Sequence, residues 1–393
     1  MGLLKVIIVR KTAKQKALAI MLKRKVLIVD TSDRGGIALY TEHLFSELRR
    51  TGIDIALAAG GDRSVDARGF PRNRWADPGN HSSRLRFLLR RFREIPVSVF
   101  CFMRAMHVVR PDVVNVHTVV AHRVDPYVLR WAKRRAGLVL TVHNAVLHES
   151  DDAEVRREWA RWRIADALVV HNEEAGRLVR AAAPSVPVFT VRVDLILGQT
   201  RLDKAAARQE LGVGPAPFAL MLGLIRPYKG IELMSEAWPL VLEGRPEARL
   251  VIAGLVSKQP FDALDRLCGQ PGVEPHLGWL SDDEVNLWAA AADVCLLPYS
   301  HGAHSGVLHR AVANGTPVVC APCLADEAQR FAAGPVVELS PTLWADAVMR
   351  LLDNPGRTVP VVPEAGMLAQ DMVEVYGSVP LPRRARKVAI ASP

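Results

Sequence analysis

The fold class is decided by residues 25–44, KVLIVDTSDRGGIALYTEHL, in which a short apolar run, a glycine-containing turn and an amphipathic segment follow one another. Residues 26–30 are apolar and β-branched, which is typical of a buried strand. Residues 37–44 have the apolar spacing of an amphipathic helix. A strand that leads through a tight turn into a helix is the first unit of a parallel α/β sheet.

The same alternation continues along the chain and predicts repeated β-α units in two sets. The strands of the first set are expected at residues 26–30, 53–58, 112–117, 138–143, 167–171 and 186–193. Those of the second set are expected at residues 218–223, 249–254, 294–298, 317–321 and 336–339. Two doubly wound halves are therefore predicted.

The length of 393 residues also favours two domains. Between the two sets, residues 203–212 are a helix-forming stretch closed by Gly212, and a turn-rich stretch follows. We expect an extension at residues 1–20, with Met21 as the natural start of the chain. The expected parts after it are an N-terminal Rossmann-like domain at 21–200, a linker region at 201–214, a C-terminal Rossmann-like domain at 215–376 and a basic tail at 377–393.

The composition of the chain indicates which kinds of partner and site it favours. The formal net charge of +10 favours anionic partners: nucleic acid, acidic lipid or phosphate-bearing substrates. No apolar run reaches the roughly 18 to 20 residues that a membrane-spanning helix needs, so we do not expect the chain to cross a bilayer. The five scattered cysteines argue against a disulfide framework and for a reducing cytoplasm. Cys320 and Cys323 form a lone C-x-x-C, and no zinc site is expected there.

The turn after the first strand contains Gly35 and Gly36. Adjacent glycines let the backbone approach a ligand closely, and the N–H groups of a helix start attract anions. A tight turn without a ligand is the alternative. The G-x-G-x-x-G spacing of a dinucleotide-binding fingerprint is absent.

Histidines end three neighbouring strands of the first set. His143 is expected to face the ligand crevice, where an imidazole can bind a sugar hydroxyl or share a proton near neutral pH. A structural histidine is the alternative. His117 and His171 end their strands in the same way, which predicts a cleft wall lined by histidines.

The strongest candidate site lies in the second set. Arg226 and Lys229 follow the strand at 218–223, on a turn where two cations can grip a diphosphate. A solvated surface pair is the alternative. Ser305 opens the helix after the strand at 294–298, and its hydroxyl with the next backbone N–H groups makes an anion cradle. The cradle is expected to complement Arg226 and Lys229 on one ligand.

Taken together, these segments resemble the retaining GT-B glycosyltransferases of family 4. The resemblance covers nearly all of residues 25–376 and rests on Gly35-Gly36, 141–144 (TVHN), 207–212 (ARQELG), 226–230 (RPYKG), 251–254 (VIAG), 277–280 (LGWL) and 305–319. It implies an α/β protein of the GT-B class, with two doubly wound Rossmann-like domains facing a central cleft. It also implies a hexosyltransferase that moves a sugar from a nucleotide diphosphate sugar. In such an enzyme the domain at 21–200 is the acceptor domain and the domain at 215–376 is the nucleotide-sugar domain.

The resemblance assigns roles to individual positions. His143, Arg226 and Lys229 are the implied catalytic residues, with His143 on the donor sugar and the two cations on its diphosphate. The other implied donor-binding residues are Gly35, Gly36, Tyr299, Ser305, Gly306, Val307 and Arg310. Retention is commonly explained by front-face attack, in which the leaving phosphate accepts the acceptor's proton. No Asp-x-Asp pair ends a strand, so neither a metal nor any other cofactor is expected.

One departure concerns two glutamates, separated by seven residues, that the family usually carries around this loop. Here the corresponding positions are Gly302 and Arg310. The second glutamate normally holds the nucleotide ribose, and an arginine cannot accept hydrogen bonds. Ribose binding differs, or the alignment is shifted, or activity is lost. The glycine-serine loop resembles a subgroup that lacks these acids, which is the reading we favour.

The acceptor remains open between a glycan, as in polysaccharide biosynthesis, a glycolipid and a small molecule. The arginines between Arg84 and Arg93 lie on an amphipathic pattern that suits an anionic membrane face or the phosphate of a lipid-linked acceptor. An ordinary surface helix is the alternative. We therefore expect a cytoplasmic protein with a peripheral place on the inner face of the membrane. The competing hypothesis is a catalytically silent GT-B scaffold that binds nucleotide or glycan. Specific nucleic-acid binding is not expected, because no known motif is present.

Overall fold

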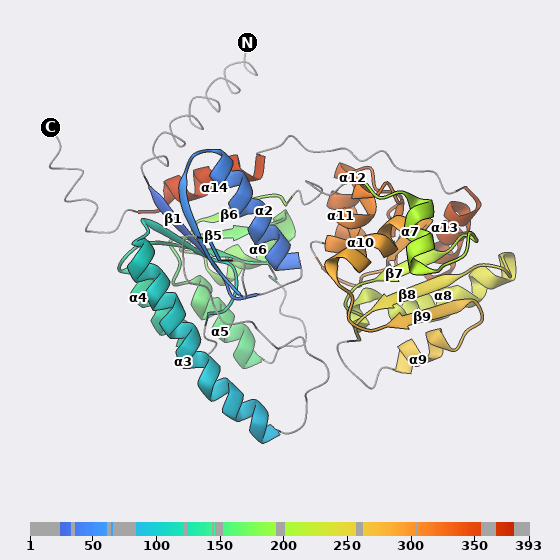
Figure 1. Ribbon diagram of the computed structural model, residues 1–393, viewed down its shortest axis with the longest axis horizontal. Coiled ribbons are helices and arrows are strands. Elements are labelled where there is room, and N and C mark those ends of the chain that lie inside the picture. The colour runs from blue at the N-terminus through green and yellow to red at the C-terminus, as the bar shows by residue number, and fades with distance from the viewer. Residues whose placement is uncertain are drawn as a thin grey trace, which may run out of the picture. The chain divides into compact units, whose positions relative to one another are not determined.

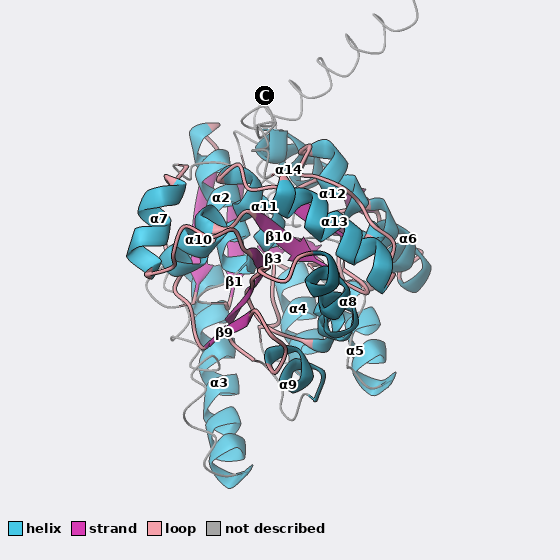
Figure 2. Cartoon of the chain, turned by 90° about the vertical axis from the view of Figure 1, so that its right-hand side faces the viewer, coloured by secondary structure: helices cyan, strands magenta, loops and turns pink. Residues whose placement is uncertain are grey.

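The computed structural model of the chain describes residues 24–32, 36–60, 64–65, 84–120, 124–143, 145, 152–193, 201–256, 262–302, 305–354 and 367–380. The chain forms two compact units (Figure 1). The first unit contains the described residues up to Val193 and those after Glu364, and the second lies within Asp194–Pro363. Strands and helices alternate along both units (Figure 2).

The first unit is built on a parallel sheet of six strands in the order β2-β1-β3-β4-β5-β6. The strands are β1 (Lys25–Asp30), β2 (Asp54–Ala59), β3 (Val113–Val116), β4 (Gly137–Thr141), β5 (Ala167–Val170) and β6 (Val188–Thr190). Strands β1, β3, β4 and β5 are apolar and almost wholly buried, as expected when helices cover both faces of a sheet. The strand order reverses between β1 and β3, which makes the carboxyl end of β1 a switch point where ligands bind in such sheets.

The helices of the first unit are α2 (Gly36–Arg50), α3 (Arg84–Val109), α4 (Asp125–Lys133), α5 (Asp152–Trp162), α6 (Glu173–Ala182) and α14 (Met367–Ser378). Helix α14 packs on α2 and β5, and Arg24 donates hydrogen bonds to the carbonyl oxygens of Tyr376 and Val379. The expected boundary at residue 376 assigned this segment to the second domain. In the structure it completes the first unit, because its buried side chains pack there.

The second unit is a parallel sheet of five strands in the order β11-β10-β7-β8-β9. The strands are β7 (Ala219–Leu222), β8 (Leu250–Gly254), β9 (Val273–Leu277), β10 (Val294–Leu297) and β11 (Val318–Cys320). Strand β9 was not predicted, since this edge strand is partly exposed and contains Pro275 rather than an apolar run. Residues 336–339 were expected to form a strand, but they contribute only an isolated bridge from Val336 to Cys320.

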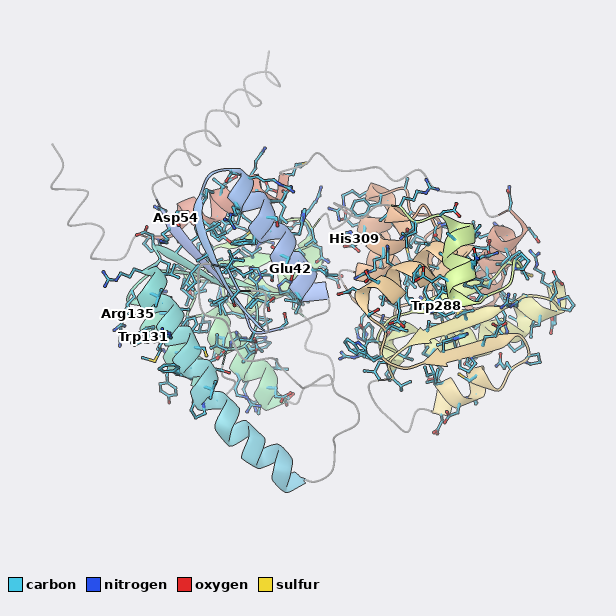
Figure 3. The ribbon with its side chains drawn as sticks, viewed as in Figure 1. Glu42, Asp54, Trp131, Arg135, Trp288 and His309 are labelled. Atoms are coloured by element: carbon cyan, nitrogen blue, oxygen red, sulfur yellow. The ribbon has the colours of Figure 1, made fainter. Side chains whose placement is uncertain are left out.

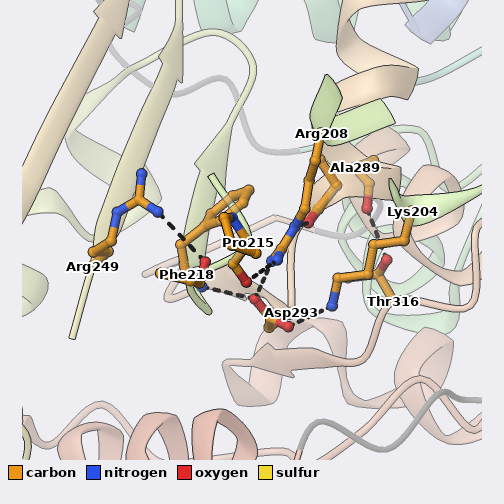
Figure 4. A network of polar contacts seen from close by, with 10 residues as sticks. Lys204, Arg208, Pro215, Phe218, Arg249, Ala289, Asp293 and Thr316 are labelled. Atoms are coloured by element: carbon orange, nitrogen blue, oxygen red, sulfur yellow. Dashed lines mark hydrogen bonds and ion pairs between the residues drawn. The ribbon is translucent and has the colours of Figure 1, made fainter. Parts of the chain in front are cut away.

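The helices of the second unit are α7 (Lys204–Leu211), α8 (Ile231–Gly244), α9 (Asp262–Cys268), α10 (Asp282–Ala291), α11 (Gly306–Ala313), α12 (Ala325–Arg330) and α13 (Pro341–Asp353). Helix α7, expected as a linker, is anchored to the buried Asp293 (Figure 4). Lys204 pairs with one carboxylate oxygen, and Arg208 pairs with the other at 2.6 Å. The backbone N–H of Phe218 donates to the same oxygen as Arg208, at 2.7 Å. These contacts make α7 part of the second unit.

The predicted α/β class with two doubly wound parallel sheets is confirmed. None of the helices that the structure describes combines the length and the hydrophobicity needed to span a bilayer.

Candidate functional site

The turn after β7 is held against the end of β10. Gly230 has a φ of +76°, and a Cβ at this position would lie 2.0 Å from the carbonyl oxygen of Pro298. Only glycine allows this approach. The backbone N–H of Ser300 also donates to the carbonyl oxygen of Tyr228 at 2.8 Å. The segment with Arg226 and Lys229 is therefore tied to the loop that leads into α11.

Lys229 is a buried cation. Its Nζ donates to the carbonyl oxygen of Leu222 at 3.3 Å and lies 5.0 Å from the centre of the Tyr299 ring. Burial lowers the pKa of Lys229 to about 8, and the guanidinium of Arg226 adds to this lowering. The Nε of Arg226 is buried and has no hydrogen-bond partner among the described residues. Two like charges in this setting favour the binding of an anion.

Lys229 and Val307, in the first turn of α11, both lie close to Gly223. A Cβ on Gly223 would lie 3.4 Å from Lys229 Nζ and 3.5 Å from Val307 Cγ2, so both side chains approach the same point. Ser305 caps the helix, because its Oγ accepts from the backbone N–H of Leu308 at 3.3 Å. The Tyr299 hydroxyl lies 3.3 Å from that Oγ, and burial raises the pKa of Tyr299 far above its usual value. The structure thus brings Lys229, Tyr299, Ser305 and Val307 together.

A buried carboxylate, Glu327 on α12, also lies at this helix start. Its Oε2 accepts from the backbone N–H of Ser305 at 3.1 Å, and its Oε1 lies 3.3 Å from Nε2 of His309 on α11. His309 is labelled in Figure 3. The Ser305 amide is therefore engaged within the protein. The amides of Gly306 and Val307, which have no intrahelical partners at a helix start, are the donors that can face a ligand. Sequence reasoning missed Glu327, since a glutamate on a short helix is typical of a solvated surface.

Arg310 is engaged elsewhere. Its Nη1 donates to the backbone oxygen of Asp282 at 2.9 Å, and its Nη2 pairs with the Asp282 carboxylate at 2.5 Å. These contacts join α11 to the first turn of α10. Gly302 has a φ of +136°, which disfavours a glutamate in this loop conformation. The predicted contact of Arg310 with the donor stays a prediction, and the bonds from Arg310 to Asp282 do not favour it.

The three strand-end histidines of the first unit lie together around Tyr40 of α2. The centre of the Tyr40 ring lies 5.4 Å from that of His117 and 5.0 Å from those of both His143 and His171. They follow β3, β4 and β5, which are neighbours in the sheet. Gly36 is the exposed first residue of the same α2, whereas Gly35 lies outside the described residues.

Hydrogen bonds fix these rings. Nδ1 of His117 lies 2.7 Å from the Thr41 hydroxyl, and its Nε2 lies 3.0 Å from the Asn115 amide nitrogen. Nε2 of His171 lies 3.2 Å from Nδ1 of His143. The cluster is therefore an ordered polar wall at the carboxyl edge of the first sheet.

The described part of the chain contains no group of three or more His, Cys, Asp and Glu side chains arranged to hold a metal ion. All five cysteines are free thiols, and Cys323 donates from its Sγ to the carbonyl oxygen of Tyr299.

Comparison with known proteins agrees with these features. Residues 34–191 match the family model described as Glycosyltransferase Family 4, and residues 216–354 match Glycosyl transferases group 1. D-inositol 3-phosphate glycosyltransferase of Mycolicibacterium gilvum is 29% identical over 324 residues, which are 74% of this chain and 70% of that protein. D-inositol 3-phosphate glycosyltransferase 2 of Catenulispora acidiphila is 32% identical over 55% of this chain and 56% of its own length. An uncharacterized glycosyltransferase of Methanocaldococcus jannaschii is 36% identical over 30% of each chain. The matched part of the chain thus spans between 30% and 70% of the length of these relatives.

Solved structures share the fold at low identity. Sucrose-phosphate synthase from Thermosynechococcus elongatus superposes with a TM-score of 0.62 at 19% identity, covering 94% of this chain and 100% of that one. HepE of Anabaena, solved with UDP and glucose, superposes with a TM-score of 0.57 at 14% identity, with the same coverage.

Proposed function

The chain is a family 4-like glycosyltransferase with the GT-B fold, and from this premise we propose that it transfers a sugar from a nucleotide diphosphate sugar with retention of configuration. The observation that carries the proposal is that Lys229 Nζ and the side chain of Val307, in the first turn of α11, both lie against Gly223. A buried cation and the start of a helix on either side of one point are suited to an anionic leaving group.

The donor's diphosphate is proposed to lie between the cations Arg226 and Lys229 and the amides of Gly306 and Val307. Because Lys229 is buried, its charge acts in a medium of lower effective dielectric than water, and the attraction to phosphate is stronger there. We propose that these cations carry the charge that a divalent metal carries in other enzymes. Activity that persists in the presence of EDTA would support this assignment.

The reaction proposed is a front-face displacement. The bond from the anomeric carbon to the diphosphate oxygen breaks, and a bond to the acceptor oxygen forms on the same face. The acceptor's proton passes to an oxygen of the leaving diphosphate. The protein's task is then to stabilise the departing charge and to orient the two substrates. His143 is proposed to contact the donor sugar, and the turn at Gly35 and Gly36 to close over the reacting centre.

The second candidate is a silent scaffold that binds nucleotide or glycan without turnover. Its support is the pairing of Arg310 with Asp282 at a position where the family usually has a ribose-binding glutamate. The two candidates differ in donor consumption, which a scaffold lacks.

We also propose that α3 places the protein on an anionic membrane surface, on the inner face of the membrane, near a lipid-linked acceptor. The described part of α3 exposes apolar side chains, with Phe100 at 63% and Val97, Met103 and Val108 beside it in sequence. The helix begins with five arginines between Arg84 and Arg93. Sedimentation with anionic vesicles, but not with neutral ones, is expected, and Phe100→Asp should reduce it.

The donor site is tested by thermal unfolding with UDP, GDP and ADP. We expect one of them to raise the Tm. The double variant Arg226→Met and Lys229→Met, which keeps much of the apolar stems, should abolish the rise, whereas Arg266→Met at an exposed pair with Glu232 should not. An unchanged rise in the double variant rejects the site. Consumption of the matching nucleotide sugar then separates the enzyme from the scaffold.

A further inference from the structure

A buried carboxylate lies beside the amides that we assign to the donor's diphosphate. Glu327 on α12 is 4% exposed. Its Oε2 accepts from the backbone N–H of Ser305 at 3.1 Å, and its Oε1 lies 3.3 Å from Nε2 of His309. Ser305 directly precedes Gly306, at which α11 begins. The carboxylate is therefore held one residue before the N–H groups of Gly306 and Val307.

This carboxyl group is expected to be ionised. A carboxylate that accepts a backbone N–H at a helix start is stabilised by that bond and by the positive end of the helix dipole. Its charge is felt at Tyr299, because burial raises the pKa of that tyrosine and the charge of Glu327 makes a smaller contribution in the same direction. The centre of the Tyr299 ring lies 5.0 Å from Lys229 Nζ. An anion in the donor site is thus bound close to a fixed negative charge.

We propose that Glu327 is a positioning residue that occupies the Ser305 amide and, through its charge, makes the donor site favour the nucleotide sugar over the nucleoside diphosphate product. The inference rests on the proposed function. The terminal phosphate of the free product ionises a second time with a pKa of about 6, so the product carries about one more negative charge than the donor at neutral pH. Repulsion by a fixed carboxylate grows with the charge of the ligand. Glu327 therefore weakens the binding of the product more than that of the donor.

Replacement by glutamine isolates this charge. Glu327→Gln keeps the length of the side chain and an oxygen that can accept from Ser305, and it removes one negative charge whatever other groups the carboxylate contacts. The matched control is Asp293→Asn. Asp293 is also 4% exposed and accepts a backbone N–H, from Phe218 at 2.7 Å, but it lies just before β10, at the amino edge of the sheet. Both variants lose a buried charge, and one of the two charges lies at the start of α11.

Three ligands of increasing charge test the proposal on the full-length protein. They are the diphosphate among UDP, GDP and ADP that raises the Tm, the diphosphate glucose with the same base, and the uncharged nucleoside. In Glu327→Gln, the Kd of the diphosphate should fall about three- to tenfold, the size expected of one partly screened charge. The Kd of the diphosphate glucose should fall less, and that of the nucleoside should not change.

A purely structural role of Glu327 predicts a different result, namely a rise of all three Kd values or an equal change in them. Either outcome, or an unchanged Kd of the diphosphate, overturns the proposal. Glu327→Asp keeps the charge and should keep the wild-type ratio of the diphosphate Kd to the diphosphate glucose Kd. Asp293→Asn should keep it too. A lowered ratio in either of these two variants also overturns the proposal.

A second neutral variant covers a failure to fold. Glu327→Met has no polar hydrogens to bury and replaces Glu327→Gln in the comparison if the new amide disturbs the fold. If neither variant folds, the carboxylate serves the fold rather than the affinity, and the proposal is rejected.

Inorganic pyrophosphate separates this inference from the proposed function. If the wild type binds no nucleotide, the proposed function is rejected. The role of Glu327 then stands if pyrophosphate raises the Tm more in Glu327→Gln than in the wild type, and it is rejected if there is no such gain. Nucleotide binding by the wild type together with an unchanged diphosphate Kd in Glu327→Gln rejects the inference alone.

Discussion

The side-chain amide of Asn115 donates a 2.9 Å hydrogen bond to the hydroxyl of Tyr376, although 261 positions separate the two residues. The same nitrogen lies 3.0 Å from Nε2 of His117, and the hydroxyl of Thr141 donates to the amide oxygen at 3.0 Å. Every polar atom of the Asn115 side chain is therefore used. Helix α14 thus reaches into the polar interior of the first unit, next to the histidine cluster.

Tyr376→Phe should destabilise the first unit. The change leaves one buried N–H of Asn115 without an acceptor, which costs about 1 to 3 kcal/mol of unfolding free energy. Urea denaturation, followed with a probe in the first unit, measures this loss of unfolding free energy. Tyr127→Phe, at a tyrosine that is 73% exposed, is the control and should have no effect. Equal midpoints for the two variants would contradict the inferred role of the hydroxyl.

Nucleotide binding should take up protons at alkaline pH. The pKa of Lys229 in the free protein is about 8, and a bound diphosphate raises it because an anion favours the charged form. At pH 8, binding should therefore draw in about half a proton, and affinity should fall as the pH rises further. Calorimetry in buffers of different ionisation enthalpy measures the uptake. Lys229→Arg, which stays charged, should show none, and heats independent of buffer in the wild type would refute the assignment.

Arg310→Met should weaken the fold rather than the donor site. The variant loses the bonds to Asp282 that join α11 to α10, at a cost of about 1 kcal/mol for this half-exposed partner. The Kd for the nucleotide should stay within about twofold of the wild type, a change worth less than 0.5 kcal/mol. Denaturation and titration on the same samples separate the two effects. A Kd raised tenfold or more would show that Arg310 contacts the donor.

Gly230→Ala should damage both stability and donor binding. The new Cβ meets the Pro298 carbonyl at 2.0 Å in a backbone with φ of +76°, so the turn with Arg226 and Lys229 must move. We expect the free energy of unfolding to fall by more than about 1 kcal/mol and the nucleotide-induced rise in Tm to become smaller. Gly214→Ala is the matched control, because its Cβ meets nothing within 4 Å. Wild-type nucleotide binding in Gly230→Ala would show that the turn tolerates displacement.

The pattern of apolar and polar residues along the sequence predicted most of the fold. Of the eleven strands in the described residues, ten lie where apolar β-branched runs indicated them, since burial in a parallel sheet imposes such runs. Strand β9 was missed because an edge strand needs less apolar surface, and the run at 336–339 lacked a partner strand beyond an isolated bridge. Helix α14 was assigned to the nearer domain because sequence proximity does not reveal a return of the chain.

Less of the candidate site could be predicted. The turn with Lys229 and the helix start at Ser305 were both expected at a sheet's carboxyl edge, but their meeting beside Gly223 depends on the pairing of β7 with β10. The engagement of Glu327 with Ser305 and of Arg310 with Asp282 depends on helix packing, for which residue type alone carries no signal. The linked histidines at 143 and 171 follow from the neighbouring places of β4 and β5.

Because α14 follows the second unit in the chain but packs in the first, the first unit can be completed only late in translation. The second unit is one uninterrupted stretch of the chain, whereas the first is split by it. On the ribosome, the strands of the first unit emerge early, but the helix that supplies Tyr376 emerges only after the whole second unit has been translated. At ordinary translation speed this interval is roughly ten to thirty seconds. During that time the surface of α2 and β5 that α14 covers stays open, so a nascent chain stalled before Met367 carries a complete second unit and an unfinished first one.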